Sequence, residues 1–182
     1  MRRCPWADTE DALMREYHDA WWGRPCRDEG HLFEMLTLEG AQAGLSWATI
    51  LHKRENYRRA FDGWDIERIA AYDAGRIEEL LREPGIVRNR LKVASVVTNA
   101  RAVLKLGSLA DFIWNYVDGE PIVNAPESMA DLPATTPLSD RISKDMKKLG
   151  FSFIGSTVIY SFLQSVGVVN DHMAWCDFRP KA

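Results

Sequence analysis

The sequence predicts an all-α protein with a single domain, and three observations support this fold class. Apolar residues recur with helical spacing along nearly the whole chain, most clearly in the stripe of Val93, Val96, Val97, Ala100 and Val103. Serine or threonine stands at the start of several of these segments, as expected of helix caps. The composition, 46% hydrophobic and 27% charged over 182 residues, is typical of one globular core.

The expected helices follow one another with few interruptions. The first spans residues 9–20, with Thr9 as its cap, and helices at 29–44 and 46–61 come next, the second capped by Ser46. Further helices are expected at 66–72, 75–82, 88–106 and 108–117. The proline-containing segment 121–137 is predicted to be an irregular surface loop. A helix at 139–149 begins at Ser139 and ends at Gly150, and the apolar segment 155–168 is expected to be a central buried helix.

Composition also excludes several classes of protein. No run of 18 apolar residues is present, which argues against a membrane span. The first residues lack the apolar core of a signal peptide, so we expect a cytoplasmic protein, most simply a monomer. Three widely spread cysteines do not indicate a disulfide framework in that compartment, and favour a metal site or buried thiols.

Glu39 stands where the helical period predicts a leucine. Its neighbours on the same helical face are Leu32, Leu36 and Ala43. A carboxylate in an apolar stripe is costly unless a cation or a hydrogen-bond donor meets it. Trp47 follows after the small-residue break at 43–46, so the pair predicts a pocket for a planar ligand such as a nucleobase. The alternative is a structural acid, paired with an arginine such as Arg54 or with a capping amide.

A second candidate site is the turn at 83–87, between two predicted helices. Six basic residues against one acid lie between positions 82 and 105, although the net charge of the chain is −3. A Pro-Gly turn with backbone N–H groups at a helix N-terminus suits a phosphate, and Arg88, Arg90 and Lys92 add attraction to a polyanion. This arrangement resembles a helix-hairpin-helix over about 75–104. A plain helical turn with a solvated basic face is an equal alternative.

A third candidate is a metal site. His172 and Cys176 are four residues apart, so on a helix they would share one face, a spacing suited to two tetrahedral zinc ligands. Cys4 and His18 could complete a closed Cys2His2 site that joins the terminal segments 4–18 and 172–176. Such a zinc ion would be structural. The alternative is a buried cysteine and a partly exposed histidine.

Several ordered motifs make the chain similar to DNA-3-methyladenine glycosylase I, the constitutive alkylation-repair glycosylase family of bacteria. They lie at residues 3–6, 17–19, 22–23, 32–35, 38–47, 53–57, 148–151, 160–162, 164 and 167–172. The longest reads Leu-Glu-Gly-Ala-Gln-Ala-Gly-Leu-Ser-Trp at 38–47. This resemblance implies an all-α helix-hairpin-helix DNA glycosylase fold over residues 1–182, with a zinc site that ties the N- and C-termini.

The resemblance also implies roles for individual residues. Cys4, His18, His172 and Cys176 become zinc ligands. Glu39 becomes the catalytic carboxylate at the edge of the flipped base, with Tyr17 and Trp47 as stacking and bonding partners and Trp6 and Trp22 as the pocket wall. Leu45 becomes the plug of the gap left in the duplex. Gly85, Ile86 and Val87 become a phosphate clamp, flanked by Arg88 and Arg90 and assisted by a monovalent cation.

The implied activity is hydrolysis of the N-glycosidic bond of 3-methyladenine in alkylated double-stranded DNA, without lyase activity. Met14 departs from the family, where an aromatic residue is frequent, and the acidic net charge predicts modest, salt-sensitive DNA affinity. The superfamily's usual catalytic aspartate is missing, since the context of Asp111 does not match, which agrees with this family. The rival classes are a non-catalytic zinc-stabilised module that binds DNA or a nucleobase, and a regulatory zinc protein.

Overall fold

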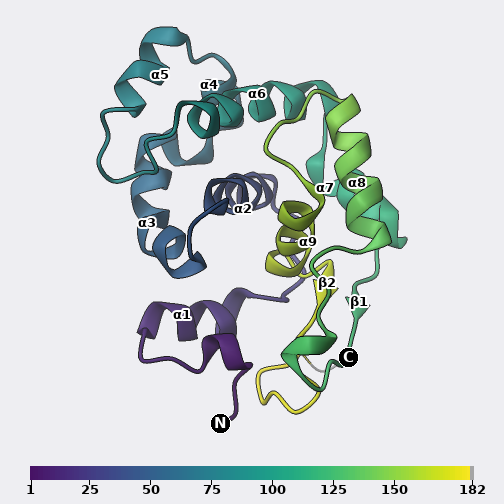
Figure 1. Ribbon diagram of the computed structural model, residues 1–182. Coiled ribbons are helices and arrows are strands. Elements are labelled where there is room, and N and C mark those ends of the chain that lie inside the picture. Colours follow the sequence, from purple (N-terminus) through teal and green to yellow (C-terminus); the bar gives the residue numbers. More distant parts are fainter. Residues whose placement is uncertain (181–182) are drawn as a thin grey trace.

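The computed structural model describes residues 1–180, and they form a helical protein built around one central helix (Figure 1). The helices are α1 (Ala12–Glu16), α2 (Glu29–Gln42), α3 (Trp47–Ala60), α4 (Ile66–Ala70), α5 (Ala74–Leu80), α6 (Arg90–Leu106), α7 (Leu109–Trp114), α8 (Pro137–Lys148) and α9 (Ser156–Ser165). Short helical turns accompany them: η1 (Pro5–Ala7), η2 (Tyr17–Trp21), η3 (Asp62–Trp64), η4 (Asn115–Val117) and η5 (Met129–Asp131). Within residues 1–180, each helix is too short or too polar to cross a bilayer.

Helix α2 lies at the centre, with α9 beside it and α3 to α6 on one side (Figure 1). Every residue from Leu32 to Ala41 is buried, so α2 is not the one-faced amphipathic helix that its spacing suggests. A helix enclosed on all sides is normally apolar all round. Two carboxylates, Glu34 and Glu39, nevertheless lie in this enclosed stretch, and each requires a separate explanation.

The predicted helix starts are partly correct. Ser46 caps α3 as expected, and its hydroxyl accepts the N–H of Thr49. The first helix begins later than predicted, because Asp11 and not Thr9 is the cap and accepts the N–H groups of Leu13 and Met14. Helix α8 begins earlier, because Thr136 forms a reciprocal capping box in which Ser139 is the third helical residue.

Two small strands depart from the all-α prediction. β1 (Ile122–Val123) lies in the segment predicted to be loop and pairs in parallel with β2 (Val169–Asn170), with Ile122 opposite Val169 and Val123 opposite Asn170. Two-residue strands give too short a pattern to detect in a sequence. This pairing anchors the segment after α7 to the segment after α9.

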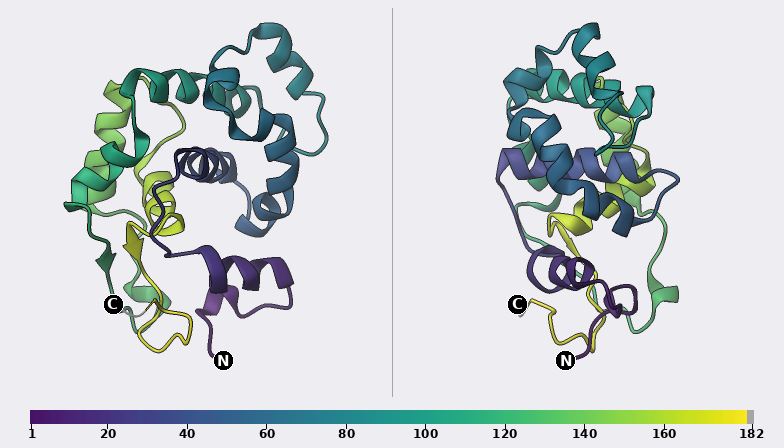
Figure 2. Two further views of the ribbon diagram at one scale, coloured as in Figure 1. Left: turned by 180° about the vertical axis from the view of Figure 1, so that it is seen from behind. Right: turned by 90° about the vertical axis from the view of Figure 1, so that its left-hand side faces the viewer.

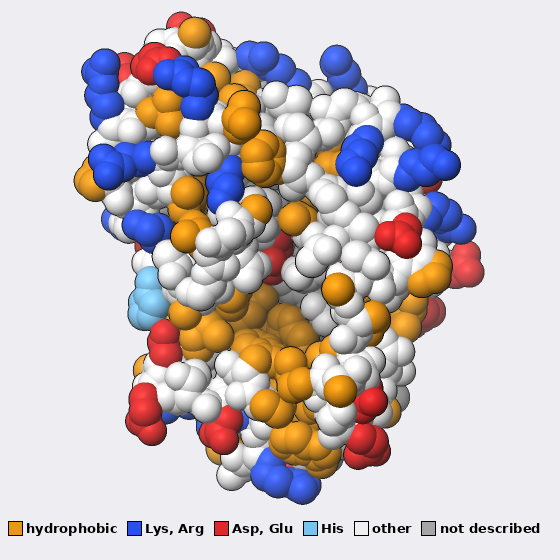
Figure 3. All heavy atoms as spheres, in the orientation of Figure 1, with side chains coloured by type: hydrophobic (Ala, Val, Ile, Leu, Met, Phe, Trp, Pro, Cys, Tyr) orange, Lys and Arg blue, Asp and Glu red, His pale blue; other side chains and the backbone are white. Residues whose placement is uncertain are grey.

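The two terminal segments lie together at one end of the molecule in all views (Figures 1 and 2). The amide of Asp177 donates to the carbonyl of Arg2, which joins them directly. Between this end and the α3 to α6 side, the surface is hollowed and floored by hydrophobic side chains (Figure 3). Lysine and arginine side chains gather above the hollow in this view, and acidic ones lie around its lower part.

Candidate functional site

The hollow contains a cavity of about 390 Å³. It is bounded by the N-terminal segment, by α2, α3 and α9, and by the loop that carries η5. Its lining residues are Trp6, Met14, Tyr17, Trp22, Glu39, Gln42, Trp47, Met129, Leu132, Ser161 and Gln164. The predicted pocket residues therefore meet in one place, with Met14 among them. The cavity is large enough for one purine and is mainly aromatic, as small-molecule sites usually are.

Among residues 1–180, Glu39 is the only carboxylate that lines this cavity, and no counter-ion meets its side chain. It is 5% exposed, and burial alone raises its pKa to about 8. The alternative that Glu39 pairs with Arg54 is wrong, because the Arg54 guanidinium donates two hydrogen bonds of 2.9 Å to Glu34. An acid held in this way prefers its neutral form when the pocket is free, and favours its anionic form when a cation enters.

The aromatic wall is built from rings that touch each other. Tyr17 lies 5.2 Å from Trp47 and 6.1 Å from Trp6 between ring centroids, and Trp6 meets Trp22 edge-on at 5.0 Å. Such tilted contacts hold flat side chains in fixed orientations. The indole N–H of Trp47 is buried and has no hydrogen-bond partner within residues 1–180. A donor left free beside an unpaired carboxylate is suited to a polar ligand.

A groove of about 230 Å³ adjoins the cavity and shares Glu39, Gln42 and Ser161 with it. Leu45, 40% exposed, lies on this groove in the turn that follows α2. Gly44 precedes it with φ +81°, a conformation that glycine adopts without strain. The structure thus places the predicted plug residue next to the cavity that Glu39 lines, on a tight turn at the molecular surface.

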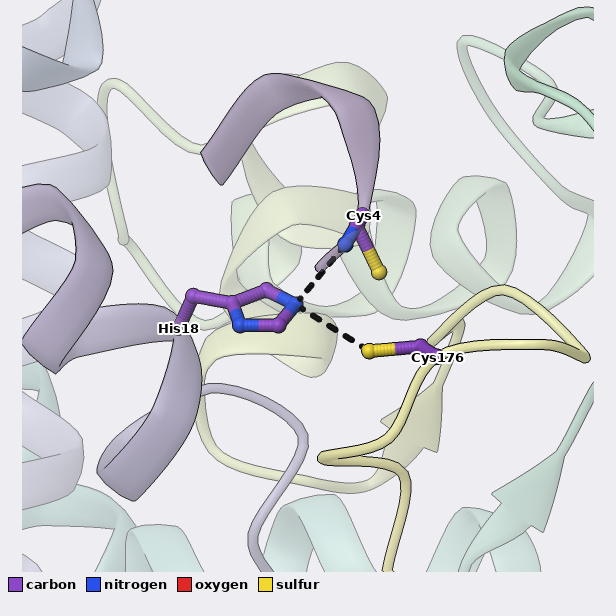
Figure 4. A group of neighbouring side chains, drawn as sticks. All are labelled: Cys4, His18 and Cys176. Atoms are coloured by element: carbon purple, nitrogen blue, oxygen red, sulfur yellow. Dashed lines mark hydrogen bonds between the residues drawn. The ribbon is translucent and has the colours of Figure 1, made fainter. Parts of the chain in front are cut away.

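The predicted metal ligands lie behind the aromatic wall. Donor atoms of Cys4, His18 and Cys176 all lie within 4.8 Å of one another, and the three side chains are buried (Figure 4). The Nε2 atom of His18 is 3.6 Å from the Cys176 sulfur. The fourth predicted ligand, His172, packs beside them, with its ring 4.9 Å from that of His18. The terminal segments therefore bring Cys4, His18 and Cys176 into one cluster, and His172 packs against it; a fourfold ligand set stays a prediction.

The expectation that His172 and Cys176 share a helical face is wrong. Helix α9 ends at Ser165, and residues 171–176 form an irregular turn after β2, in which the N–H of Cys176 donates to the Met173 carbonyl. The turn is closed onto the N-terminal segment, because the Met173 N–H donates to the Cys4 sulfur at 3.4 Å. The side chains of His172 and Cys176 are therefore brought near each other by this turn and not by a helix.

Both histidines hold the tautomer that a metal ligand needs. The Nδ1 atom of His18 lies 2.8 Å from Asp19, and since a carboxylate only accepts, Nδ1 carries the proton. His172 Nδ1 lies 2.9 Å from the side-chain oxygen of Asn170, which also accepts the His172 backbone N–H. Each Nε2 is therefore an unprotonated lone-pair donor, and that of His172 is buried without a partner within residues 1–180.

At the position of the predicted hairpin, the chain forms α5, a turn, and α6. Helix α6 begins at Arg90 with Asn89 as its cap, two residues later than predicted. Gly85 packs so closely on α3 that a Cβ atom there would lie 2.8 Å from Asn56. The N–H groups of this turn have internal partners: that of Gly85 donates to Glu83, and that of Val87 to the Tyr57 hydroxyl. Ile86 is buried.

The basic side chains around this turn differ in availability. Arg88 is exposed, whereas Arg90 is paired with Glu78. Lys92 does not point to a phosphate site: its ammonium donates to the carbonyls of Ala41 and Ala43 at 2.8 and 2.6 Å. The number of basic residues in this part of the sequence is therefore larger than the number of side chains that are free to contact a polyanion.

Five cavity residues had no predicted role: Gln42, Met129, Leu132, Ser161 and Gln164. Gln42 is one helical turn beyond Glu39, and Ser161 and Gln164 are polar residues one turn apart on α9, so spacing and polarity could have indicated these three. Met129 and Leu132 come from the segment 121–137, whose path no local pattern defines. They reach the cavity only through the tertiary fold.

Comparison with known proteins places these features in a family. The model of the methyladenine glycosylase family matches residues 6–180. DNA-3-methyladenine glycosylase 1 of Escherichia coli is 44% identical over 184 residues, covering 99% of this chain and 98% of its own. A crystal structure of 3-methyladenine DNA glycosylase I has a TM-score of 0.96 at 47% identity, covering 98% and 100% of the two chains. A variant of such an enzyme in complex with 3-methyladenine has a TM-score of 0.95 at 37% identity, covering 100% and 99%.

Proposed function

Because this chain belongs to the methyladenine glycosylase family and is a DNA-3-methyladenine glycosylase, we propose that it flips 3-methyladenine out of alkylated double-stranded DNA into the cavity around Glu39. There it hydrolyses the N-glycosidic bond and leaves an abasic site. The observation that carries this proposal is the unpaired, buried carboxylate of Glu39 in an aromatic cavity. Such a site suits a flat cation with an exocyclic amine.

Recognition rests on charge and shape together. A purine methylated at N3 in DNA carries a positive charge, which the faces of Trp47 and Tyr17 attract. The Glu39 carboxylate accepts from the exocyclic amine and supplies negative potential where no protein cation competes for it. Unmodified adenine brings no charge, so it gains little from either interaction.

The chemistry needs little acid catalysis. N3-methylation weakens the glycosidic bond, and the base leaves as a neutral molecule without first being protonated. Flipping costs a few kcal/mol, and less for a damaged pair. Glu39 then stabilises the positive charge that develops on the sugar as the bond lengthens, and water attacks the sugar carbon. No lysine takes part, so the proposed enzyme is monofunctional and leaves the strand uncut.

Contacts with DNA are proposed at two places. Leu45, exposed beside the base pocket, fills the gap that the flipped nucleotide leaves in the stack. The turn Gly85, Ile86 and Val87, with Arg88 and Arg90, meets the backbone on the same side. Glu83 must release the Gly85 N–H for this, since it now accepts that group at 3.0 Å. A monovalent cation at this turn, implied by the resemblance, stays a prediction.

We also propose that Cys4, His18, His172 and Cys176 hold a structural zinc ion. The support is the donor set: two buried thiols, two imidazoles with unprotonated Nε2 atoms, and Asp19 and Asn170 fixing the ring tautomers. The Nε2 atom of His18 now accepts the Cys4 N–H at 3.4 Å, whereas that of His172 has no partner within residues 1–180. When bound, zinc supplies a cross-link between the terminal segments. The rings of His18 and His172 pack directly on Trp6 and Trp22, so this cross-link also fixes the pocket wall.

Base release from methylated DNA tests the catalytic proposal. Purified protein is incubated with DNA treated with a methylating agent, and the released bases are separated by chromatography. We expect 3-methyladenine, no 7-methylguanine and no strand cleavage; whether 3-methylguanine is also released is read from the same trace. Binding of free 3-methyladenine without any release would leave the pocket correct and the catalytic part wrong, as in a non-catalytic binding module.

Metal analysis tests the zinc proposal separately. We expect about one zinc per chain in the purified protein, and a lower Tm after chelation that added zinc restores. The variant Cys176→Ser should lose the metal, whereas Cys26→Ser, at the cysteine outside the cluster, should keep it. Protein that folds and excises base with no bound metal contradicts this part and leaves the glycosylase proposal intact.

A further inference from the structure

Lys92 makes an unusual contact for a lysine on a basic face. It lies on the first turn of α6, just after the turn at 83–87. Its ammonium lies 2.8 Å from the Ala41 carbonyl and 2.6 Å from the Ala43 carbonyl. These oxygens belong to the end of α2, about fifty residues earlier in the chain. One cation therefore ties the hairpin helix to the last turn of the central helix.

The end of α2 depends on this contact more than other helix ends do. The residue that follows each of α3, α6, α8 and α9 donates its N–H back to a carbonyl of its own helix. Ala43, which follows α2, makes no such bond within residues 1–180. Helix ends leave several carbonyls without donors, and a lysine can satisfy them while also meeting the negative end of the helix dipole.

The segment fixed in this way carries both parts of the site. Glu39 lies on the last turn of α2, before the two clamped carbonyls, and Leu45 lies two residues after them. Between them, Gly44 has φ +81° and no neighbouring atom within 4 Å of a Cβ position, so the turn has no packing of its own there. Within the turn, the Leu45 N–H donates to the Gln42 carbonyl at 2.6 Å, and the carbonyl contacts of Lys92 connect the turn to a second helix, α6.

The burial of the ammonium agrees with an internal role. The Lys92 residue is partly buried, and this burial lowers the pKa of its ammonium. A lysine that serves a phosphate keeps its charge in solvent, like the exposed Arg88 four residues earlier.

We propose that Lys92 is a positioning residue, which holds the end of α2 so that Leu45 enters the duplex while Glu39 meets the flipped base. It couples the hairpin, which follows the DNA backbone, to the segment that replaces the base. This inference rests on the proposed function of Leu45 and of the hairpin. It predicts that Lys92 acts on DNA-dependent excision and not on the affinity of the pocket for a free base.

The test compares four variants with the wild-type protein. Lys92→Met removes the donor at nearly constant length, and Lys92→Arg keeps a donor. Arg88→Met removes an exposed charge of the hairpin, and Lys144→Met removes an exposed lysine of α8 as a matched control. Three quantities are measured: the rate of 3-methyladenine release from methylated DNA, the Kd for free 3-methyladenine by calorimetry, and the salt dependence of binding to a duplex with an abasic-site analogue.

For Lys92→Met we expect release to slow by about tenfold, because small misplacements of a reacting pair are costly. The Kd for the free base should stay within about twofold of wild type, and Lys92→Arg should restore most of the rate. The slope of log binding constant against log salt should stay unchanged for Lys92→Met. For Arg88→Met it should fall by about 0.9, the value for one lost phosphate contact.

Three results would overturn the inference: wild-type release by Lys92→Met, a salt slope lowered as much as in Arg88→Met, or equal losses of base affinity and release rate. If Lys92→Met does not fold, the same quantities in Lys92→Arg and Lys92→Gln decide the question. Failure of the proposed function is distinct from these results, since the wild-type protein would then release no base at all.

Discussion

Glu34 and Glu39 lie five residues apart on the same buried helix, and the two regions around them treat a carboxylate in opposite ways. Around Glu34, the guanidinium of Arg54 lies at 2.9 Å, that of Arg58 at 3.1 Å and the ring of His31 at 3.3 Å. Burial alone would raise the pKa of Glu34, but these partners outweigh it and lower the pKa to about 2. Around Glu39 there is burial, no cation from the described part of the chain offsets it, and the pKa rises to about 8.

The difference separates a structural acid, Glu34, from Glu39, the acid that we propose is functional. The charge of Glu34 is neutralised by side chains of the protein itself. Arg54 also stacks over Trp21, whose ring contacts that of Tyr17 in the pocket. The Glu39 carboxylate is not paired with a cation of the described residues. This lowers the stability of the fold but keeps the carboxylate available for a cationic base. Glu34 and Glu39 occupy similar positions on α2. Their different roles therefore follow from the elements that pack around each of them.

The largest expected effect comes from removing the functional acid. Glu39→Gln should reduce 3-methyladenine release by about a hundredfold or more, because the amide cannot supply negative charge to the cationic base. The rate is measured on methylated DNA at a saturating enzyme concentration. Release at the wild-type rate, by a protein with an unchanged circular dichroism spectrum, would show that Glu39 has no catalytic role.

Removing the structural acid should instead affect folding. Glu34→Gln removes the carboxylate that pairs with Arg54 and leaves Arg58 with only its 3.9 Å contact to Glu55, so it should lower the free energy of unfolding at pH 7 by about 2 kcal/mol. Because the folded pKa of Glu34 is depressed, its stabilisation is present above pH 4.5 and is lost as the pH falls towards 2. Denaturant titrations of the two proteins should therefore converge at low pH. A stability difference that is independent of pH would contradict this account.

The next largest effect that should distinguish the two regions is the pH dependence of ligand binding. A permanently cationic base such as 3,9-dimethyladeninium requires the Glu39 carboxylate, whose pKa in the free pocket is about 8. Its Kd should fall as the pH rises from about 6 to 8, by up to about tenfold per unit, and level off above that range. Calorimetry over this range, repeated on Glu39→Gln, should give a flat profile for the variant. A flat profile for wild type would mean that Glu39 is already ionised in the free pocket.

The smallest effect is a gain in stability. Since the pKa of Glu39 is raised from 4.5 to about 8 on folding, the wild-type protein loses stability as the pH rises through that window. Glu39→Gln avoids this loss and should be more stable than wild type at pH 8 by about 1 kcal/mol, a difference that disappears near pH 4.5. Thermal unfolding at both pH values measures it. A variant that is less stable at pH 8 would imply an unseen partner for the carboxylate.

Features encoded locally were predictable from the sequence. Ser46 caps α3 because a serine before a helical pattern can satisfy a free N–H of the first turn, and Glu39 was identifiable because its polarity breaks an apolar period. Trp47 was expected to line a pocket because it follows the small-residue break after Glu39. Tyr17, Trp6 and Trp22 came from the resemblance, and the structure brings all four rings to one cavity. Their roles in excision stay predictions.

Features that depend on distant partners were not predictable. The charge of Lys92 was assigned to DNA attraction, yet its partners are carbonyls at the end of α2. His172 and Cys176 were related by a helical spacing, but a turn after β2 brings them near His18. The wall residues Met129 and Leu132 belong to a loop whose course follows from β1 pairing with β2. In each case the deciding contact joins segments that no local pattern relates.

The closure of the two ends also determines when the pocket can form during synthesis of the chain. The Met173 N–H meets the Cys4 sulfur across a separation of 169 residues, and His172 packs on Trp22. Contacts between such distant residues have a large cost in loop-closure entropy, so they form only after the intervening helices have condensed. A nascent chain can therefore assemble α2 to α9 before its aromatic wall is fixed. We expect the base pocket to be the last part to fold, so that an unfinished chain cannot hold damaged DNA.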